Sequence, residues 1–280
     1  MRRDVFKAKN KRQINLIIHA DDIGMCHSAN KASEEAYEKG VVSSGSLMAP
    51  APWFMDAATY FRSHPEFDVG IHVTLTSEWK LYRWPPVAPR DKVPGLVSGD
   101  GFMYRTSEEV AKHASGREVE AEIRFQIERV LEFGVKPTHM DTHMGTVHYR
   151  PEYLEAYADL AVEYGIPVMV HNSSPEIRRK VSHLVPVVPQ YVGYPAQGSL
   201  DERKAAALKM LGGLKPGVYE TILHLGGDDD EIRAIIGDDT HFRHEEYLIF
   251  SNPEVRQAIK DREIRLVGWR DLKHLAPPQN

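Results

Sequence analysis

The stretch Ile14–Gly24, INLIIHADDIG, decides the fold of this 280-residue chain. Its apolar part, Leu16–Ile18, is short, β-branched and free of charge, which is typical of a strand covered on both faces. The strand ends in two adjacent carboxylates, Asp21 and Asp22. Carboxylates that share a site repel each other, and a bound cation or proton offsets that repulsion. The pair therefore predicts a functional site, whereas the alternative interpretation makes Asp22 the N-cap of the next helix.

Two later segments repeat the pattern of an apolar strand that carries histidine. VGIHVTLT has His72 at its centre, and THMDTH, residues 138–143, has polar residues at every second position. Period two places His139, Asp141 and His143 on one face of a strand. A lone histidine in a strand is more often an ordinary core residue, but two such strands and an aspartate form a one-carboxylate, two-histidine set. Such a set leaves coordination positions open on a divalent metal, as a catalytic site requires.

Four motifs, in order along the chain, resemble those of the YdjC-like carbohydrate deacetylases, distant relatives of the polysaccharide deacetylases. The motifs are ADDIG at 20–24, VVSSGSLM at 41–48, GIHVTL at 70–75 and PTHMDTH at 137–143. The resemblance covers nearly the whole chain and is most specific in the first half. It implies an α/β fold, a distorted TIM-like (β/α) barrel like that of the polysaccharide deacetylases. It also implies one divalent metal ion, Mg²⁺ or Zn²⁺, at the carboxyl ends of the strands.

The resemblance also implies roles for individual residues. The second aspartate of the pair, Asp22, and the histidines His72 and His143 are the expected metal ligands. Asp21 is the expected general base for the attacking water. His224, in the later strand ETILHL, is the expected acid that protonates the departing amine.

The chain departs from the family pattern after His143. The family usually continues with further histidines before a proline, whereas this chain reads HMGTVHYRP, with one histidine missing and two additional residues. His148 is the candidate for the last family histidine. The change leaves the expected metal ligands intact and concerns the substrate side of the site.

Three further side chains are candidates for the surroundings of the site. Asp141 is expected either to orient a ligand histidine or to be a solvated aspartate at the end of a strand. His171 ends a strand-like segment, at the position where barrel sites are built. Trp84, with Trp79 and Tyr82, is either an aromatic platform for a sugar ring, or a hydrophobic plug or subunit contact.

Composition limits the partners and the location that the protein can have. The chain has 35 basic and 40 acidic residues and a net charge of −5, which gives no support for binding to nucleic acid or to an anionic membrane. No apolar run approaches the length of a membrane span. Residues 1–13 form a basic tail without the apolar region of a secretion signal. The single cysteine, Cys26, permits a reducing compartment, and the expected location is cytoplasmic.

Residues 14–275 are expected to form a single barrel domain, because strand-like and helix-like segments alternate along them. Two stretches interrupt the alternation, 84–101 and 226–241, and we expect both to be long loops over the mouth of the barrel. The acidic run at 228–231 lacks the ligand spacing of a calcium loop and is expected to be a solvated turn. Helical patterns cover residues 28–39, 107–134, 151–164, 200–211 and 253–260.

The sequence therefore predicts a metal-dependent hydrolase that removes the acetyl group from an N-acetylated amino sugar or a small chito-oligosaccharide. A divalent metal, a carboxylate base and a histidine acid together supply what hydrolysis of an unactivated amide requires. The expected partner is that sugar, and the assembly considered is a homodimer.

Two alternatives of other kinds remain open. Another metal-dependent barrel enzyme, an amidohydrolase or a sugar isomerase, is disfavoured because the first strand reads His-Ala-Asp rather than His-x-His and few acidic residues end the other strands. An inactive carbohydrate-binding protein on the same fold is disfavoured because both aspartates and all three histidines are present.

Overall fold

The strands of the chain pair into one parallel sheet in the computed structural model, which describes residues 13–171, 173–237 and 240–275. Within these residues the strand order is β4-β3-β2-β1-β6-β5, with β7 beside the start of β1. Every pairing between these strands is parallel. The strands are β1 (Ile14–Ile23), β2 (Ser44–Leu47), β3 (Val69–Val73), β4 (Met140–Thr142), β5 (Gln190–Tyr191), β6 (Gly217–His224) and β7 (Arg265–Leu266).

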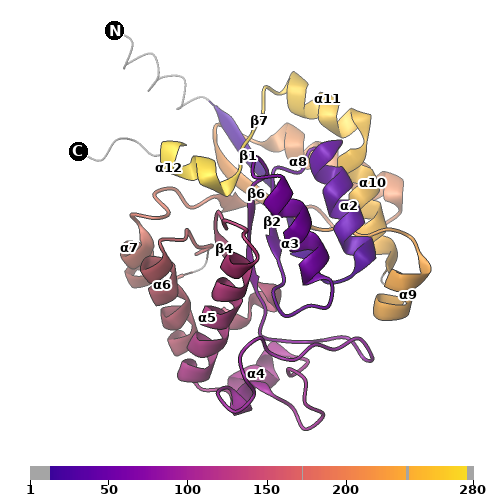
Figure 1. Ribbon diagram of the computed structural model, residues 1–280. Helices are drawn as coiled ribbons and strands as arrows, with labels where there is room; N and C mark the ends of the chain where they lie inside the picture. The colour runs from indigo at the N-terminus through magenta and orange to yellow at the C-terminus, as the bar shows by residue number, and fades with distance from the viewer. Residues whose placement is uncertain (1–12, 172, 238–239, 276–280) are drawn as a thin grey trace.

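Helices connect the strands and cover the outer side of the curled sheet (Figure 1). The sheet with its helices forms a half-barrel, which confirms the predicted α/β, TIM-like architecture. The α-helices are α2 (His27–Glu38), α3 (Phe54–Ser63), α4 (Ser107–His113), α5 (Gly116–Glu132), α6 (Pro151–Tyr164), α7 (Pro175–Val181), α8 (Leu200–Gly213), α9 (Asp230–Ile236), α10 (Thr240–Ser251), α11 (Pro253–Asp261) and α12 (Leu272–Leu275). Short 3₁₀ helices are η1 (Pro94–Leu96), η2 (His143–His148) and η4 (Trp269–Asp271).

The first strand, β1, lies in the middle of this sheet. It pairs with β6 along most of its length and with β7 and then β2 on its other side. Leu16–Ile18 are fully buried, as expected for an uncharged apolar run in a parallel sheet covered by helices. The carboxyl end of β1, with Asp21 and Asp22, therefore lies where its neighbours β2 and β6 also end.

Three expected elements differ in the structure. The amphipathic stretch 107–134 is divided into α4 and α5, because the Ser115 side chain accepts the N–H of Glu118 and starts a new helix. The expected loop 226–241 contains α9, so that prediction is wrong in part. Asp229 is the N-cap of α9 and accepts a hydrogen bond from the Ile232 N–H at 3.1 Å, so the acidic run is not simply a solvated turn.

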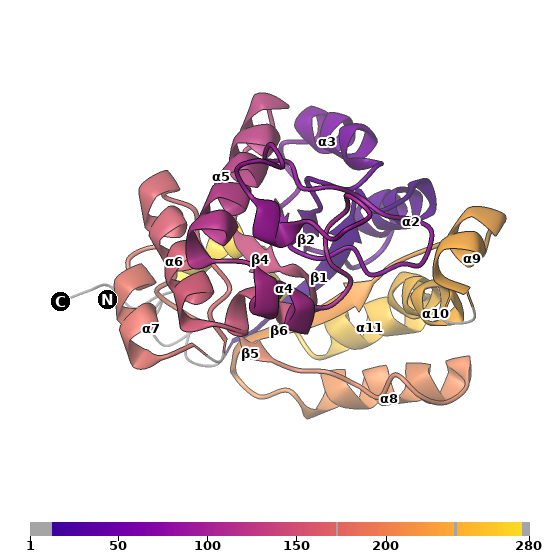
Figure 2. The same ribbon diagram turned by 90° about the horizontal axis from the view of Figure 1, so that it is seen from below.

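Residues 168–171, expected as a strand, contribute a single parallel bridge between Val168 and Met140. The segment between β3 and α4 crosses the carboxyl ends of the strands, as expected for the loop 84–101 within it (Figure 2). No helix in the described ranges is both long and apolar enough to span a bilayer. The predicted basic tail, residues 1–13, lies outside the described residues except for its last residue.

Candidate active site

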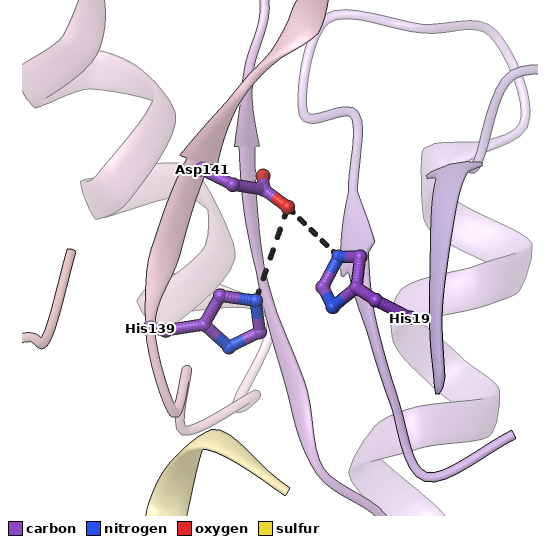
Figure 3. Close-up of side chains that lie close together, drawn as sticks. All are labelled: His19, His139 and Asp141. Carbon is purple, nitrogen blue, oxygen red and sulfur yellow. Dashed lines mark ion pairs between the residues drawn. The ribbon is translucent and has the colours of Figure 1, made fainter. Parts of the chain in front are cut away.

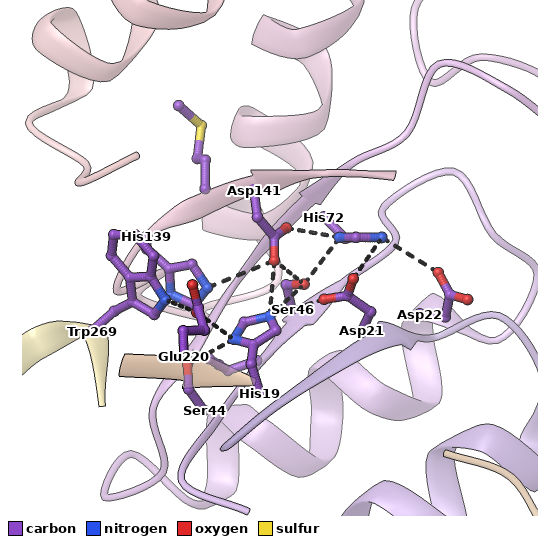
Figure 4. A network of polar contacts seen from close by, with 12 residues as sticks. His19, Asp21, Asp22, Ser44, Ser46, His72, His139, Asp141, Glu220 and Trp269 are labelled. Carbon is purple, nitrogen blue, oxygen red and sulfur yellow. Dashed lines mark hydrogen bonds and ion pairs between the residues drawn. The ribbon is translucent and has the colours of Figure 1, made fainter. Parts of the chain in front are cut away.

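Polar side chains gather on the inner face of the curled sheet, towards the carboxyl ends of its strands (Figure 4). Strand register brings them together, since His72 pairs with Asp141 across β3 and β4, and Asp21 pairs with His224 across β1 and β6. His19 and Asp21 lie two residues apart in β1 and share a face, with His19 Nε2 at 3.1 Å from Asp21 Oδ1.

Adjacent residues of a regular strand point to opposite faces, yet Asp21 and Asp22 both reach the site. The register between β1 and β2 shifts between Ala20 and Ile23, which marks a bulge. Within it Asp22 adopts a left-handed backbone conformation, with φ at 61°. Aspartate enters this region more readily than most residues. The irregularity thus turns the second carboxylate of the pair towards the histidines.

The three residues expected as metal ligands lie together. Asp22 Oδ1 is 3.3 Å from His72 Nε2 and 3.1 Å from His143 Nδ1. One ligand atom from each residue lies within 4.8 Å of the others, and all three side chains are buried. Asp22 Oδ1 itself is buried without a hydrogen bond of good geometry. A carboxylate oxygen and two imidazole nitrogens converging in this way fit a single divalent ion.

The remaining ring nitrogen of each histidine faces a carboxylate. His72 Nδ1 is 2.7 Å from Asp141 Oδ1, and His143 Nε2 is 3.1 Å from Glu78 Oε2. Metal-binding histidines usually donate their other N–H to such an acceptor, which fixes the ring and raises its basicity. These two contacts fix the orientation of both rings, and they leave the nitrogens that face Asp22 free to bind an ion.

The charges around these residues keep the Asp22 carboxylate ionised, as a metal ligand must be. Arg243, from α10, donates to Asp22 Oδ2 at 2.6 Å, and its side chain is partly buried. Burial alone would raise the pKa of the Asp22 carboxyl, but Arg243 and His143 hold it well below its usual range. Burial alone would lower the pKa of His143, whereas Glu78 and Asp22 raise it to about 9. The surroundings of His143 thus stabilise positive charge there.

The expected base and acid lie beside this cluster. Asp21 Oδ2 is 3.9 Å from His72 Nε2 and 3.8 Å from His224 Nε2. The His224 side chain is about half exposed (47 %), while its backbone N–H donates to Glu246 Oε2 of α10 at 2.6 Å. Both residues line a cleft of about 730 Å³, a volume within the range of small-molecule sites. Its wall also includes Thr142, Met144, His171 and Tyr191.

Of the weaker candidates, the structure places some at the site and one away from it. Asp141 contacts His72 and is fully surrounded by protein, so it is not a solvated strand end. His171 lines the cleft, with Nε2 at 3.5 Å from Glu220 Oε2. His148, at the end of η2, is exposed, and within the described residues no hydrogen bond or ion pair joins it to Asp22, His72 or His143.

The structure distinguishes between the two interpretations of Trp84, a sugar platform and a hydrophobic plug. Its side chain is only 1 % exposed, and its Nε1 donates to the Thr76 carbonyl oxygen at 2.8 Å. It packs among Met25, Met48 and Met103 beneath the loop that crosses the strand ends. The structure therefore supports the alternative of a hydrophobic plug, because a sugar ring cannot reach a face of this indole.

Replacing Trp84 by Ala should lower stability and leave substrate binding largely unchanged. Removing a large aromatic side chain from a packed site costs about 3–5 kcal/mol, which should appear as a clear fall in melting temperature. The matched control is Leu81→Ala, in the same loop, since Leu81 is 89 % exposed. A raised KM with an unchanged melting temperature would restore the platform.

Sequence reasoning missed several residues that hold the site together. Glu78 lies in the loop after β3, Ser46 in β2 donates to Asp141 Oδ2 at 2.8 Å, and Arg243 and Glu246 lie in α10. A usable signal was the spacing of Arg243 and Glu246, which places both on one side of a helix. Glu220, a charge inside the apolar strand β6, was another such signal, since it is fully buried.

Several known proteins are similar to this chain along most of its length. A family model described as YdjC-like protein matches residues 15–261. A carbohydrate deacetylase of Thermus thermophilus is 30 % identical over 92 % of this chain and 93 % of its own length. Another, of Thermoanaerobacter pseudethanolicus, is 28 % identical over 92 % of this chain and 99 % of its own. A crystal structure from Enterococcus faecalis, described as a candidate cellobiose-phosphate cleavage protein, superposes with a TM-score of 0.77 at 27 % identity, covering 93 % of this chain and 99 % of that one.

Proposed function

Since the chain belongs to the family of YdjC-like proteins, we propose that it is a metal-dependent carbohydrate deacetylase. Its substrate is an N-acetylated amino sugar or a small chito-oligosaccharide, from which it releases acetate. One observation carries the proposal furthest: Asp22, His72 and His143 converge beside Asp21 and His224 at a cleft. Relatives named carbohydrate deacetylase that align along nearly their whole length support the same activity.

Asp22, His72 and His143 would hold one divalent ion, Mg²⁺ or Zn²⁺. Such an ion activates a water molecule and polarises the acyl oxygen of an amide. The protein holds these ligands rigidly before any ion arrives. Asp141 and Glu78 fix the two imidazoles, and Arg243 fixes the carboxylate through Oδ2. Two imidazoles can therefore bind an ion without further rearrangement of their rings.

Asp21 is the general base in this proposal. It borders the cleft, and its Oδ2 lies between the metal cluster and His224. The carboxylate takes the proton of the water that attacks the acetyl carbon. His224, about half exposed, then donates a proton to the sugar nitrogen as the carbon–nitrogen bond breaks. The amine thus leaves in neutral form, and the acetyl group leaves as acetate.

One further expectation about the protein, its location, stays a proposal. We place it in the cytoplasm, on the ground that its single cysteine, Cys26, is buried in the apolar core and needs no partner. Burial raises the pKa of the Cys26 thiol to about 12, so the thiol stays protonated and takes no part in the chemistry.

An acetate-release assay on N,N′-diacetylchitobiose, combined with metal analysis, tests the proposed function. We expect acetate release that stops on chelation and returns when one equivalent of a divalent ion per chain is restored. A sugar isomerase would change the sugar without releasing acetate, and a binding protein would retain the sugar unchanged. Either result contradicts the proposal.

A further inference from the structure

His19, which the mechanism above does not use, lies in β1 two residues before the proposed base, Asp21, and on the same face of the strand. Its side chain is fully buried on the inner face of the sheet (Figure 3). Nε2 is 2.8 Å from Asp141 Oδ2 and 3.1 Å from Asp21 Oδ1, and it also lies within hydrogen-bond distance of Ser46 Oγ, at 3.2 Å. On the other side of the ring, Nδ1 is 3.2 Å from Ser44 Oγ and 3.8 Å from Glu220 Oε1. One imidazole is thus surrounded by three carboxylates from three strands.

These contacts join the proposed base to a proposed metal ligand. Asp21 and Asp141 both face His19 Nε2, and the second oxygen of Asp141 faces His72 Nδ1 at 2.7 Å (Figure 4). A buried carboxylate oxygen without a partner is unfavourable, and Asp21 Oδ1 is buried with His19 Nε2 as its ion-pair partner. Asp141 Oδ2 also accepts from Ser46 Oγ at 2.8 Å, so His19 is one of two groups that hold this carboxylate against His72. Without His19, Asp21 Oδ1 would lose its partner, and Asp141 would be held less firmly as the acceptor of His72.

A proton, rather than a second metal ion, accounts for the geometry around His19. Ligand atoms of His19, His139 and Asp141 lie within 4.8 Å of one another, which alone would admit an ion. However, His19 Nε2 lies 2.8 Å from Asp141 Oδ2, a distance typical of an ion pair between a protonated imidazole and a carboxylate, and His139 Nε2 is 3.9 Å from the same oxygen. Burial alone would lower the pKa of His19, but Asp141 and Asp21 raise it to about 10. Burial and the charge on His19 lower the pKa of His139 to about 4.

We propose that His19 is a positioning residue, whose Nε2–H holds Asp21 towards the cleft and Asp141 against His72. The proposal rests on the deacetylase function in its claim about turnover, but its claim about metal affinity stands on the geometry alone. It predicts that the loss of the donor weakens metal binding and turnover together, without a change in the affinity for the sugar.

A pair of variants, His19→Gln and His19→Met, isolates the donor. Both side chains are unbranched and of the same length, but only glutamine carries an N–H that can reach the two carboxylates. In the Met variant we expect metal affinity, measured by calorimetry, to fall about 10–100-fold, as for other residues that orient a metal ligand. We expect kcat at saturating metal to fall more than about tenfold with KM unchanged. The Gln variant should stay within a few-fold of the wild type in both.

His139→Met is the matched control. His139 is equally buried on the same face, with its ring 5.0 Å from that of His19, yet neither of its nitrogens lies within hydrogen-bond distance of Asp21 or Asp141. It should keep the metal affinity and kcat of the wild type. The control separates the loss of a buried histidine from the loss of this particular donor.

Several results would overturn the role of His19. The Met variant binding metal and turning over like the wild type is one, and equal impairment of the Gln and Met variants is another. Two ions per wild-type chain and one per Met variant would instead make His19 a metal ligand. If the Met variant cannot be obtained folded, the Gln variant decides, because a loss of more than about tenfold in kcat or metal affinity contradicts a role that rests on the donor. If the wild type releases no acetate, the deacetylase function fails, while the metal affinities still test His19.

Discussion

Replacing His143 by Gln should remove the metal and with it the activity. His143 contributes one of the two imidazole nitrogens that face Asp22 Oδ1. The neutral amide of glutamine is a weaker ligand for a divalent transition-metal ion than this imidazole. Substitutions that merely reorient a ligand cost 10–100-fold, so losing a ligand should cost more than about 10²-fold in metal affinity and in kcat/KM. Metal content by mass spectrometry and acetate release measure the two effects separately.

His183→Gln serves as the control for this experiment. His183 is an exposed histidine that follows α7, outside the residues that line the cleft. The same change of residue type there should leave the metal content and the activity as in the wild type. One ion per chain at wild-type affinity in the His143 variant would show that another group of residues binds the metal.

Asp21→Asn should keep the metal and lose turnover. The amide is nearly isosteric with the carboxylate, and its oxygen can still accept a hydrogen bond from His19 Nε2. It cannot take a proton from water, however, and general-base catalysis typically contributes about 10²–10⁴-fold. We therefore expect kcat to fall by at least about 10²-fold, with metal content and melting temperature near those of the wild type.

The alternative is that Asp21 is itself a ligand. Asp21, His72 and Asp141 form a second group whose ligand atoms lie within 4.8 Å of one another. In that case Asp21→Asn would lose metal and activity in parallel. Near-wild-type turnover in the same variant would instead exclude Asp21 as the base. Measuring metal content and kcat on one preparation separates all three outcomes.

The sequence predicted the site best where its residues stand at the carboxyl end of one recognisable strand. Asp21 and Asp22 close a buried apolar run, and the structure has that run at the centre of the sheet. The proximity of Asp22, His72 and His143 was expected because carboxyl ends of parallel strands meet at one edge, and the family resemblance indicated which residues to choose. Their roles as ligands stay predictions.

The sequence predicted little of the contacts that join segments far apart in the chain. Arg243 and Asp22 are 221 positions apart, and Glu78 and His143 are 65 apart, so neither pair leaves a local pattern. The bulge that turns Asp22 into the site depends on pairing with β2, which a strand pattern does not contain. The sequence left the role of Trp84 open for the same reason, since only the folding of its loop onto a methionine-rich cluster makes it a core residue.

The helix α9 was missed for a different reason. Its first turn is acidic, and acidic runs are typical of solvated loops, but aspartate is also a preferred N-cap residue. The later apolar position Ile232, which is fully buried, was the signal that distinguished the two.

A crystal structure of the metal-loaded protein, with anomalous diffraction at the zinc absorption edge, tests the proposed metal site itself. We expect one anomalous peak, about 2.0–2.3 Å from a carboxyl oxygen of Asp22, from His72 Nε2 and from His143 Nδ1. A peak bonded to His19, His139 and Asp141 instead, or zinc absent from the Asp22 site at full loading, would contradict it.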